Sequence, residues 1–246
     1  MTGDLGRGDR VAAVMRVLIA CATSCVALNA FLARGHDAWQ CDLLPADEPT
    51  NRHIRDDVRN VMHTGWDLMI VSNPPCTRLC NSGVRWLDDP RCKCPDEATV
   101  DECAAWPGLS IPDRAVIMRR LLAEGADLFS DCWNAPVPRV AVENPVMHRH
   151  AKSLIRNFRP HAQSVHPWHF GSDEDGPDNV TKRTCLWLRG LPKLIRTGAL
   201  DGTTARPEVH HASPGPDRWK IRSRTFPGMA EAWADQWGGY AMRAAA

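Results

Sequence analysis

The sequence predicts an α/β protein in which a mostly parallel, mixed sheet carries helices on both faces. Short apolar runs rich in β-branched residues recur along the chain, and stretches with helical spacing of apolar residues separate them. This alternation is typical of βαβ units, which right-handed crossovers join into a parallel, Rossmann-like sheet. With 246 residues the chain is long enough for one sizeable core, so we expect a single domain.

The first half of the chain contains the clearest strand and helix patterns. Residues 15–21 form a short apolar run of the kind found in buried parallel strands, and residues 27–34 have helical spacing that ends at Gly35. Further strands are expected over residues 37–41 and 66–72. The first half therefore predicts at least one complete βαβ unit.

The second half adds two strands and two helices. Residues 117–133 carry apolar residues near one helix face, and Pro136 ends this helix. Strands are expected over residues 139–143 and 184–188. A final helix is expected over residues 228–237.

Three segments have no regular pattern. Residues 1–14 predict a flexible leader before a domain that spans residues 15–246. Residues 88–112 are polar and rich in Cys and Pro, which predicts an excursion over one face of the sheet. Residues 189–222 are rich in Gly, Pro and His and predict an irregular substrate region.

The composition excludes several classes of protein. Hydrophobic residues make up 43% and charged residues 24% of the chain, unlike disordered or collagen-like proteins. No run reaches the roughly 18 apolar residues of a membrane span, and the start is not signal-like, so we expect no membrane partner and a cytoplasmic location. In that compartment the ten cysteines should be reduced thiols. A net charge of +1 means that any contact with nucleic acid must come from a local basic patch.

Chemically useful residues follow the ends of the predicted strands. In an open parallel sheet the ligand crevice lies beyond the carboxyl ends of the strands, so these residues should share one cleft. They are Thr23, Ser24, Asp42, Asp57, Cys76, Glu143 and Asn144.

In chain order, these residues resemble the signature of the cytosine-5 methyltransferase family from residue 15 to about residue 188. That signature is a cofactor-binding first turn, an acidic end to the second strand, a Pro-Cys turn, a Glu-Asn-Val segment and a later Gln-x-Arg-x-Arg segment. The chain is most similar to short phage-type members, which begin with a Met-Arg-Val-Leu-Ile-Ala-Cys-like strand and carry Glu-Asn-Pro. The resemblance implies the S-adenosylmethionine-dependent methyltransferase fold in a bacterial or phage-infected host cell. It also implies methyl transfer to carbon 5 of cytosine in DNA or a nucleotide.

The Asn-Pro-Pro-Cys turn after the strand at 66–72 predicts a nucleophile. Carbon 5 of cytosine is too poor a nucleophile to accept a methyl group directly, so such an enzyme first adds a thiolate at carbon 6. Pro74 and Pro75 make the turn rigid, so that the sulfur of Cys76 projects into the cleft. A lone cysteine is otherwise more often a small buried apolar residue.

Glu143 is the expected acid, which would protonate or hydrogen-bond ring nitrogen 3 of the base and should have a pKa raised by burial. Residues 181–185 stand in place of Gln-x-Arg-x-Arg, where Lys182 or Arg183 would hold the base oxygen or a phosphate. The alternative for Glu143 is a helix cap or an ion pair with Arg, and for the two cations a solvated basic pair.

The resemblance also implies a site for S-adenosylmethionine. Its ribose hydroxyls would bind Asp42 and its adenine amino group Asp57. The family's first turn is Gly-rich, whereas residues 21–27 contain no glycine, and a positive φ there would be strained. The other residues expected at the cofactor are Cys21, Ala22, Thr23, Ser24, Asn73 and Pro74.

Further residues are expected to bind the substrate or to close the site. Residues 222–229 resemble the closing segment of phage-type members, which packs beside the first strand and would complete the cofactor pocket. The residues expected to bind the substrate are Pro75, Ser82 and Asn144.

Other interpretations of the sequence remain open. A methyltransferase-like binding or decoy protein without cofactor would explain the missing glycines. Amino-methyltransferases also use an Asn-Pro-Pro turn, but an aromatic residue follows there and Cys76 follows here. No metal site is expected, although one set of cysteines offers an alternative zinc site, namely Cys80, Cys92, Cys94 and Cys103. Five histidines are expected on the surface or in substrate loops, namely His161, His166, His169, His210 and His211.

Overall fold

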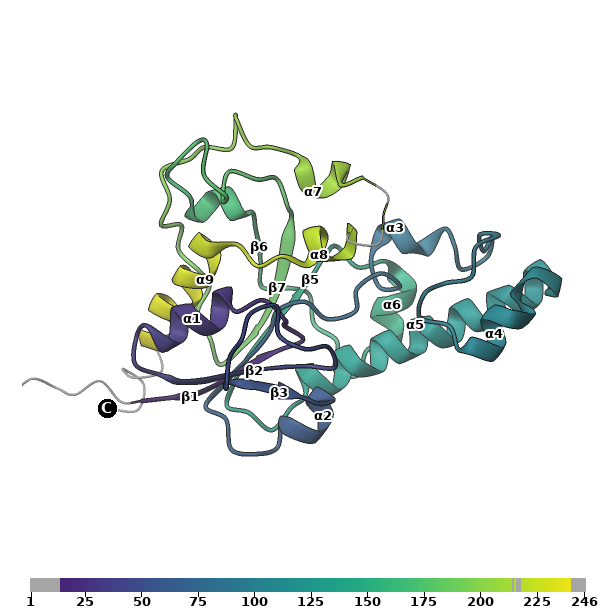
Figure 1. Cartoon of the computed structure of the whole chain (residues 1–246), viewed down its shortest axis with the longest axis horizontal. Coiled ribbons are helices and arrows are strands. Elements are labelled where there is room, and N and C mark those ends of the chain that lie inside the picture. The colour runs from purple at the N-terminus through teal and green to yellow at the C-terminus, as the bar shows by residue number, and fades with distance from the viewer. Residues whose placement is uncertain (1–13, 214, 216–217, 240–246) are drawn as a thin grey trace, which may run out of the picture.

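The computed structural model describes residues 14–213, 215 and 218–239, so the expected leader, apart from Val14, lies outside the described residues. At its centre is a seven-stranded sheet in the order β3-β2-β1-β4-β5-β7-β6 (Figure 1). Neighbouring strands are parallel, except that β7 runs antiparallel to both β5 and β6. The predicted α/β fold with a mixed, mostly parallel sheet is therefore confirmed. The strands are β1 (Arg16–Ala20), β2 (Asp37–Asp42), β3 (His53–Arg55), β4 (Leu68–Val71), β5 (Arg139–Asn144), β6 (Gln163–Val165) and β7 (Thr184–Arg189).

Helices cover both faces of the sheet. Helices α1 and α9 pack with one core cluster, and α2 and α5 pack with a second one on the other face. Short 3-10 turns occur at Trp106–Gly108 and Pro167–Phe170, and a π-helical turn at Ala234–Gly238 follows α9. The helices are α1 (Val26–Leu32), α2 (Val58–Val61), α3 (Asn81–Val84), α4 (Val100–Ala105), α5 (Ile111–Trp133), α6 (Arg149–Leu154), α7 (Glu208–His211), α8 (Arg218–Ser223) and α9 (Pro227–Trp233).

The strand β1 shows how the sequence divides between the two cores. Its side chains alternate, so that Val17 and Ile19 join the core under α1 while Leu18 and Ala20 join the core under α5. All four are fully buried, as expected for the central strand of a parallel sheet. The order 3-2-1-4-5 is that of a Rossmann sheet, and the arrangement departs from it only beyond β5.

The long helix α5 starts at Ile111, earlier than the expected range of 117–133. The hydroxyl of Ser110 caps its first turn by accepting a hydrogen bond from the Asp113 amide at 3.3 Å. Pro112 lies in this first turn, where its missing N–H costs no helical hydrogen bond. The helix therefore extends into the segment that the sequence assigns to the excursion.

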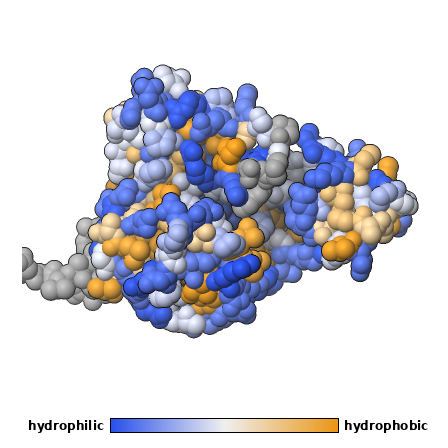
Figure 2. Space-filling model, viewed as in Figure 1, coloured by the Kyte–Doolittle hydropathy of each residue, from blue (hydrophilic) through white to orange (hydrophobic). Residues whose placement is uncertain are grey.

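The excursion forms an arm, which we define as residues 81–110 together with the start of α5, and which projects away from the sheet (Figure 1). The arm contains α4, whose first turn is closed by a reciprocal capping box between Thr99 and Glu102. Figure 2 shows apolar side chains gathered on the projecting arm, and among the exposed apolar residues there are Val100, Ile111 and Val116. Among the described residues, no helix has the length and apolar character to cross a bilayer.

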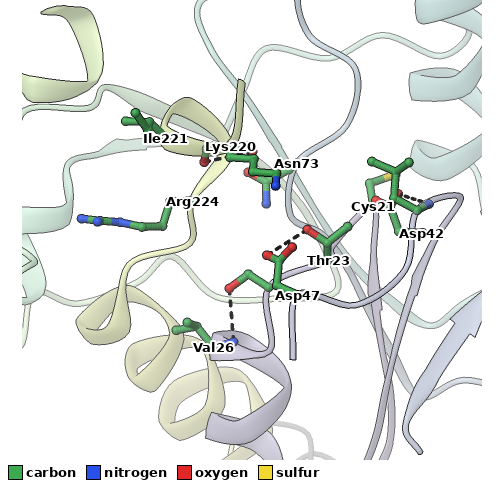
Figure 3. A pocket seen from close by; sticks show the side chains of 12 residues that line it. Cys21, Thr23, Val26, Asp42, Asp47, Asn73, Lys220, Ile221 and Arg224 are labelled. Carbon is green, nitrogen blue, oxygen red and sulfur yellow. Dashed lines mark hydrogen bonds between the residues drawn. The ribbon is translucent and has the colours of Figure 1, made fainter. Parts of the chain in front are cut away.

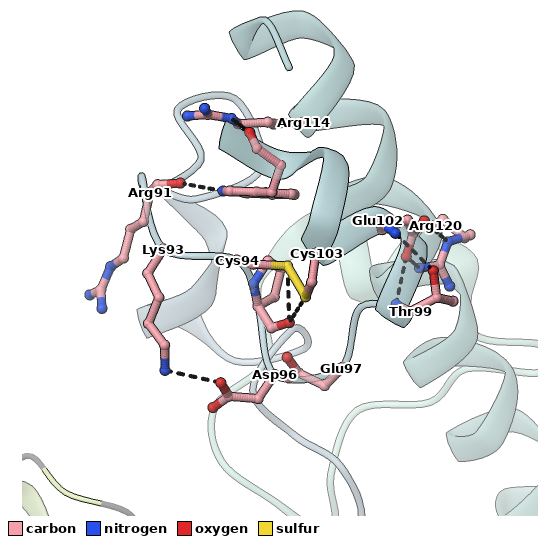
Figure 4. Close-up of a disulfide and its surroundings, with 12 residues drawn as sticks. Arg91, Lys93, Cys94, Asp96, Glu97, Thr99, Glu102, Cys103, Arg114 and Arg120 are labelled. Atoms are coloured by element: carbon pink, nitrogen blue, oxygen red, sulfur yellow. Dashed lines mark hydrogen bonds and ion pairs between the residues drawn. A yellow bond between two sulfur atoms is a disulfide. The ribbon is translucent and has the colours of Figure 1, made fainter. Parts of the chain in front are cut away.

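A disulfide joins Cys94 and Cys103 in the arm (Figure 4). The helix that begins after Thr99 turns the chain back, so that the two Cα atoms lie 5.5 Å apart. The expectation of ten reduced cysteines is therefore wrong for this pair. The alternative zinc site is weakened as well, because two of its four sulfurs are bonded to each other and no metal-binding group of His, Cys, Asp or Glu is found among the described residues.

Removing this disulfide should loosen the arm but not the sheet. The bridge closes a loop with a sequence separation of 9, which is expected to contribute roughly 2 to 3 kcal/mol to local stability. In Cys94→Ser, amide hydrogen exchange over residues 86–105 should speed up at least about tenfold, with β1, β4 and β5 unchanged. Cys92→Ser, which removes an exposed free thiol two positions away, is the control and should leave the exchange unaltered. Equal exchange in both variants would contradict a stabilising role of the bridge.

Candidate functional site

The strand order reverses between β1 and β4, and we call this place the switch point of the sheet. A cavity of about 420 Å³ lies at the switch point (Figure 3). Strands β1, β2 and β4 are parallel, so their carboxyl ends meet at this edge of the sheet. The segments that follow these strands form one side of the cavity, and α8 with the residue after it forms the other. The lining residues are Cys21, Thr23, Ser24, Val26, Asp42, Leu44, Asp47, Asn73, Lys220, Ile221, Ser223 and Arg224.

The first turn after β1 contains a strained residue. Cys21 has a φ of 54°, a left-handed conformation that costs a non-glycine residue roughly 1 to 2 kcal/mol. Of the four residues expected in this turn, Cys21, Thr23 and Ser24 line the cavity, whereas Ala22 is buried in the core under α1. The structure thus builds a left-handed turn at the place where the sequence lacks glycine.

Two carboxylates expected at the cofactor occupy different environments. Asp42 lines the cavity, accepts a hydrogen bond from the Leu44 amide at 2.9 Å, and has a pKa raised mainly by burial. Asp57 is not among the lining residues, because its carboxylate caps α2 by accepting from the Arg59 amide at 2.9 Å and pairs with the Arg59 guanidinium at 3.2 Å. The capping role that the sequence allows for any Asp before a helix is the one found for Asp57.

The Asn-Pro-Pro segment separates two cavities. Asn73 lines the first cavity and donates from Nδ2 to the Ser72 hydroxyl at 3.2 Å, while Pro74 is buried. Pro75 is exposed and lines a second cavity of about 390 Å³, which also includes Arg78 and Gly125 of α5. Of the two prolines, neither lines the cavity at the switch point.

The turn that holds Cys76 is fixed by backbone contacts. The amides of Leu79 and Cys80 donate to the Cys76 carbonyl at 3.0 and 3.1 Å. Gly83 packs so closely on this turn that a Cβ there would lie 2.1 Å from the Thr77 carbonyl oxygen, so only glycine fits. The backbone that follows Cys76 is therefore held in one tight turn.

A thiol, a carboxylic acid and an amine come together beyond β4 and β5. Lys182 Nζ lies 3.2 Å from Glu143 Oε1, and both side chains are nearly buried, with exposed fractions of 12% and 8%. The partly exposed thiol of Cys76 has a pKa raised to about 11, mainly by burial and then by Cys80 and Glu143, while Lys182 and Arg222 oppose the rise. Glu143 and Lys182 thus both influence the pKa of the Cys76 thiol, in opposite directions.

Burial also raises the pKa of Glu143, and the ammonium of Lys182 acts in the opposite direction. Lys182 Nζ further lies 3.4 Å from the carbonyl oxygen of Arg224 and 5.7 Å from the ring centre of Phe226. Arg183 is exposed, and burial and then the charge of Arg183 lower the pKa values of His161 and His166. Successive residues of an extended chain point to opposite sides, so only one of the two expected cations can face Glu143.

Two of the residues expected to bind the substrate, Ser82 and Asn144, make hydrogen-bonding contacts within the protein. Ser82 is exposed on α3, and its hydroxyl lies 3.0 Å from the thiol of Cys80. Asn144 is completely buried and donates from Nδ2 to the Pro145 carbonyl at 2.8 Å. Neither residue lines the cavity at the switch point.

Three features of this site were not evident from the sequence. Asp47 lies in the loop after β2, where its carboxylate accepts a hydrogen bond from the Thr23 hydroxyl at 3.1 Å. Lys220 of α8 lines the opposite wall. The hydroxyls of Thr225 and Ser72 lie 3.1 Å apart in a buried contact, which ties the expected closing segment to the end of β4. The expected histidines lie elsewhere, where burial lowers the pKa of His169 to about 4.

Comparison of the sequence with protein-family models and with curated proteins finds no match.

The free energy of unfolding in urea should be about 1 kcal/mol higher for the Cys21→Gly protein than for the Cys21→Ala protein. Both substitutions remove the thiol, but only alanine keeps a Cβ in the left-handed region. Inside an ordinary strand the order is reversed, and the variant with alanine is more stable than the variant with glycine by roughly 0.5 to 1 kcal/mol. A Cys21→Ala protein that is more stable than Cys21→Gly would contradict the left-handed turn.

Alkylation of Cys76 by iodoacetamide should rise about tenfold per pH unit up to about pH 10, because the thiolate reacts and its pKa is about 11. In Lys182→Met the rate at a given pH should fall, since the lysine lowers the pKa of Cys76. Arg183→Met removes the neighbouring exposed cation and should change little. Peptide-resolved mass spectrometry separates Cys76 from the other thiols, and a plateau near pH 8 would contradict a raised pKa.

Proposed function

We propose that the protein transfers a methyl group from S-adenosylmethionine to carbon 5 of cytosine, in DNA or in a nucleotide, with Cys76 as the nucleophile. The observation that carries this proposal is the ion pair of Glu143 with Lys182, whose charges both act on the thiol of Cys76. The single antiparallel strand in an otherwise parallel sheet agrees with the mixed sheet of the methyltransferase fold that the resemblance implies.

In this proposal, the Cys76 sulfur forms a bond to carbon 6 of the ring. The thiol must lose its proton in this step, and with a pKa of about 11 it is neutral in the free protein near pH 7. Lys182 and Arg222 favour the thiolate as the bond forms, because both lower the pKa of this thiol. The two cations therefore offset part of the effect of burial, which disfavours the thiolate.

Glu143 stabilises the negative charge that the thiolate addition moves into the ring. Burial raises the pKa of Glu143 against the opposing effect of Lys182, which makes it easier for the carboxyl group to take up the proton that it donates to ring nitrogen 3. Lys182 lies within hydrogen-bonding reach of the same carboxyl group and is the better candidate than Arg183 for the base oxygen. Release of the product requires loss of the proton on carbon 5 and of the Cys76 sulfur, which restores the aromatic ring.

The cavity at the switch point has the volume and donor set for an adenosyl ligand. Its volume of about 420 Å³ falls within the roughly 300 to 1,000 Å³ of small-molecule sites. The carboxylate of Asp42 at the end of β2 can accept two ribose hydroxyl hydrogen bonds, as in dinucleotide-binding sheets. When bound, S-adenosylmethionine supplies an electrophilic methyl group, and Asn73 lines the cavity only three positions before Cys76.

A second candidate is a methyltransferase-like protein that binds nucleic acid without catalysis. The strained, glycine-free turn at Cys21 favours it, because the backbone cannot approach a ligand as closely as with glycine. Against it stands the Lys182 and Glu143 pair whose charges act on Cys76, since a binding surface has no chemical need for a thiol next to a nearly buried acid.

Incubation with labelled S-adenosylmethionine and a panel of DNA and cytosine nucleotides, followed by nucleoside mass analysis, tests the proposal. The expected product is 5-methylcytosine. Cys76→Ser should abolish it, and Glu143→Gln should lower the rate at least about a hundredfold, with cofactor affinity nearly unchanged in both. Cys92→Ser, an exposed thiol on the arm, is the control and should retain full activity.

Two outcomes would contradict the proposal. Unchanged turnover in Cys76→Ser would remove this residue from the role of nucleophile. Nucleic-acid binding without any methylated product from the wild-type protein would favour the non-catalytic candidate.

A further inference from the structure

The stretch that follows α8 is held against the candidate reaction site by two contacts. The hydroxyl of Thr225 lies 3.1 Å from the hydroxyl of Ser72, directly after β4, and both residues are buried. The carbonyl oxygen of Arg224 lies 3.4 Å from Lys182 Nζ, which in turn lies 3.2 Å from Glu143 Oε1. The end of α8 is therefore fixed beside the acid and the amine that would hold the cytosine.

Arg222 lies two residues before this anchored stretch. It is exposed, and in the part of the chain that the structure describes its guanidinium forms no hydrogen bond or ion pair. Arg224, by contrast, lies 3.4 Å from Glu208. The neighbours Ile221 and Ser223 line the cavity at the switch point, and Arg222 does not. The donors of Arg222 can therefore serve an anion outside that cavity.

The charge of Arg222 acts on the proposed nucleophile. Burial raises the pKa of Cys76, and Lys182 and then Arg222 are the cations that oppose this rise. The interaction between charges weakens as they move apart, so a cation that acts on this thiol lies near it. Lys182 has Glu143 as its partner, whereas Arg222 has no ion-pair partner among the described residues.

The chemistry of the substrate indicates which anion would lie there. Carbon 6, to which the Cys76 sulfur would bond, neighbours the ring nitrogen that carries the sugar. In the anti conformation of a pyrimidine nucleotide, carbon 6 faces the 5′ end of the sugar. Ring nitrogen 3, the expected partner of Glu143, lies on the opposite side of the ring. The substrate anion closest to the Cys76 sulfur is therefore the 5′-phosphate.

We propose that Arg222 binds the 5′-phosphate of the cytidine whose base is held by Cys76 and Glu143. The inference rests on the proposed function, because it takes Cys76 as the group that bonds to carbon 6. A guanidinium can meet two phosphate oxygens with two parallel N–H groups, which adds direction to the charge. The site therefore selects cytidine with a 5′-phosphate, either as a free nucleotide or within a DNA strand, over the unphosphorylated nucleoside.

The first test measures the charge beside Cys76 without any substrate. Iodoacetate and iodoacetamide alkylate the same thiolate, but only iodoacetate is an anion. In Arg222→Met the ratio of the iodoacetate rate to the iodoacetamide rate at Cys76 should fall about two- to threefold at low salt, because a nearby cation no longer attracts the anion. Arg222→Lys should keep the ratio. Arg119→Met removes an exposed cation on α5 and is the control, with the ratio unchanged.

The second test measures ligand affinity as the protection of Cys76 against iodoacetamide. One pair of ligands is deoxycytidine 5′-monophosphate and its 3′ isomer, which have the same charge. The other pair is two deoxydinucleotides of the same composition, with the phosphodiester 5′ to the cytidine in one and 3′ to it in the other. Unphosphorylated deoxycytidine is the reference ligand.

The wild-type protein should bind the 5′ member at least about tenfold more tightly than the 3′ member, because charge-assisted hydrogen bonds are gained. Arg222→Met should remove this preference and change the affinity for deoxycytidine less than about twofold. Arg222→Lys should retain part of the preference, and Arg119→Met all of it. A preference in either pair supports the inference, and the pair that shows it tells whether the phosphate belongs to a free nucleotide or to a strand.

The outcomes separate this inference from the proposed function. An unchanged alkylation ratio in Arg222→Met would overturn the inference, because the guanidinium would then lie away from the thiol. Equal wild-type affinities within both pairs, or a 5′ preference that survives in Arg222→Met, would also overturn it and leave the cytosine site standing. No protection of wild-type Cys76 by any of the five ligands would overturn the proposed cytosine site together with the inference.

Discussion

The nearly buried ion pair between Lys182 and Glu143 joins the two parts of the chain that form the candidate site. A buried charge is stable only with a partner, so each of these residues fixes the other. Their meeting depends on the direction of β7, because in an antiparallel pair the start of one strand lies beside the end of the other, and Asn144 is paired with Cys185. A parallel strand in this place would have delivered Lys182 to the opposite edge of the sheet, away from Glu143 and Cys76.

The sequence predicted the strands of four or more residues. The runs at 15–21, 37–41, 66–72, 139–143 and 184–188 are confirmed as β1, β2, β4, β5 and β7. Of these, β1, β4 and β5 are buried along almost their whole length, which requires mostly apolar residues. β3 and β6 have three residues each and no such run, so their formation depends on the neighbouring strand. The disulfide in the arm was missed because the proximity of its cysteines depends on the path of α4.

For the site, the sequence predicted which residues lie at strand ends, but it did not predict where their side chains point. Glu143 and Cys76 could be assigned to neighbouring strand ends from order alone. Whether Lys182 or Arg183 faces Glu143 depends on the register of β7 against β5, which the sequence does not specify. Asp47 belongs to a loop, and its position follows from hydrogen bonds to Thr23 that join segments far apart in the sequence.

The buried contact between Ser72 and Thr225 has a consequence for the order in which the protein matures. Residues 218–224, which form one wall of the cavity, directly precede Thr225 and are synthesised after β7. On the ribosome all seven described strands can therefore pair while the cavity still lacks this wall. Ligand affinity thus reports the docking of a late segment, and a chain that stops before it would lack one wall of the cavity and also α9, which packs with the core under α1.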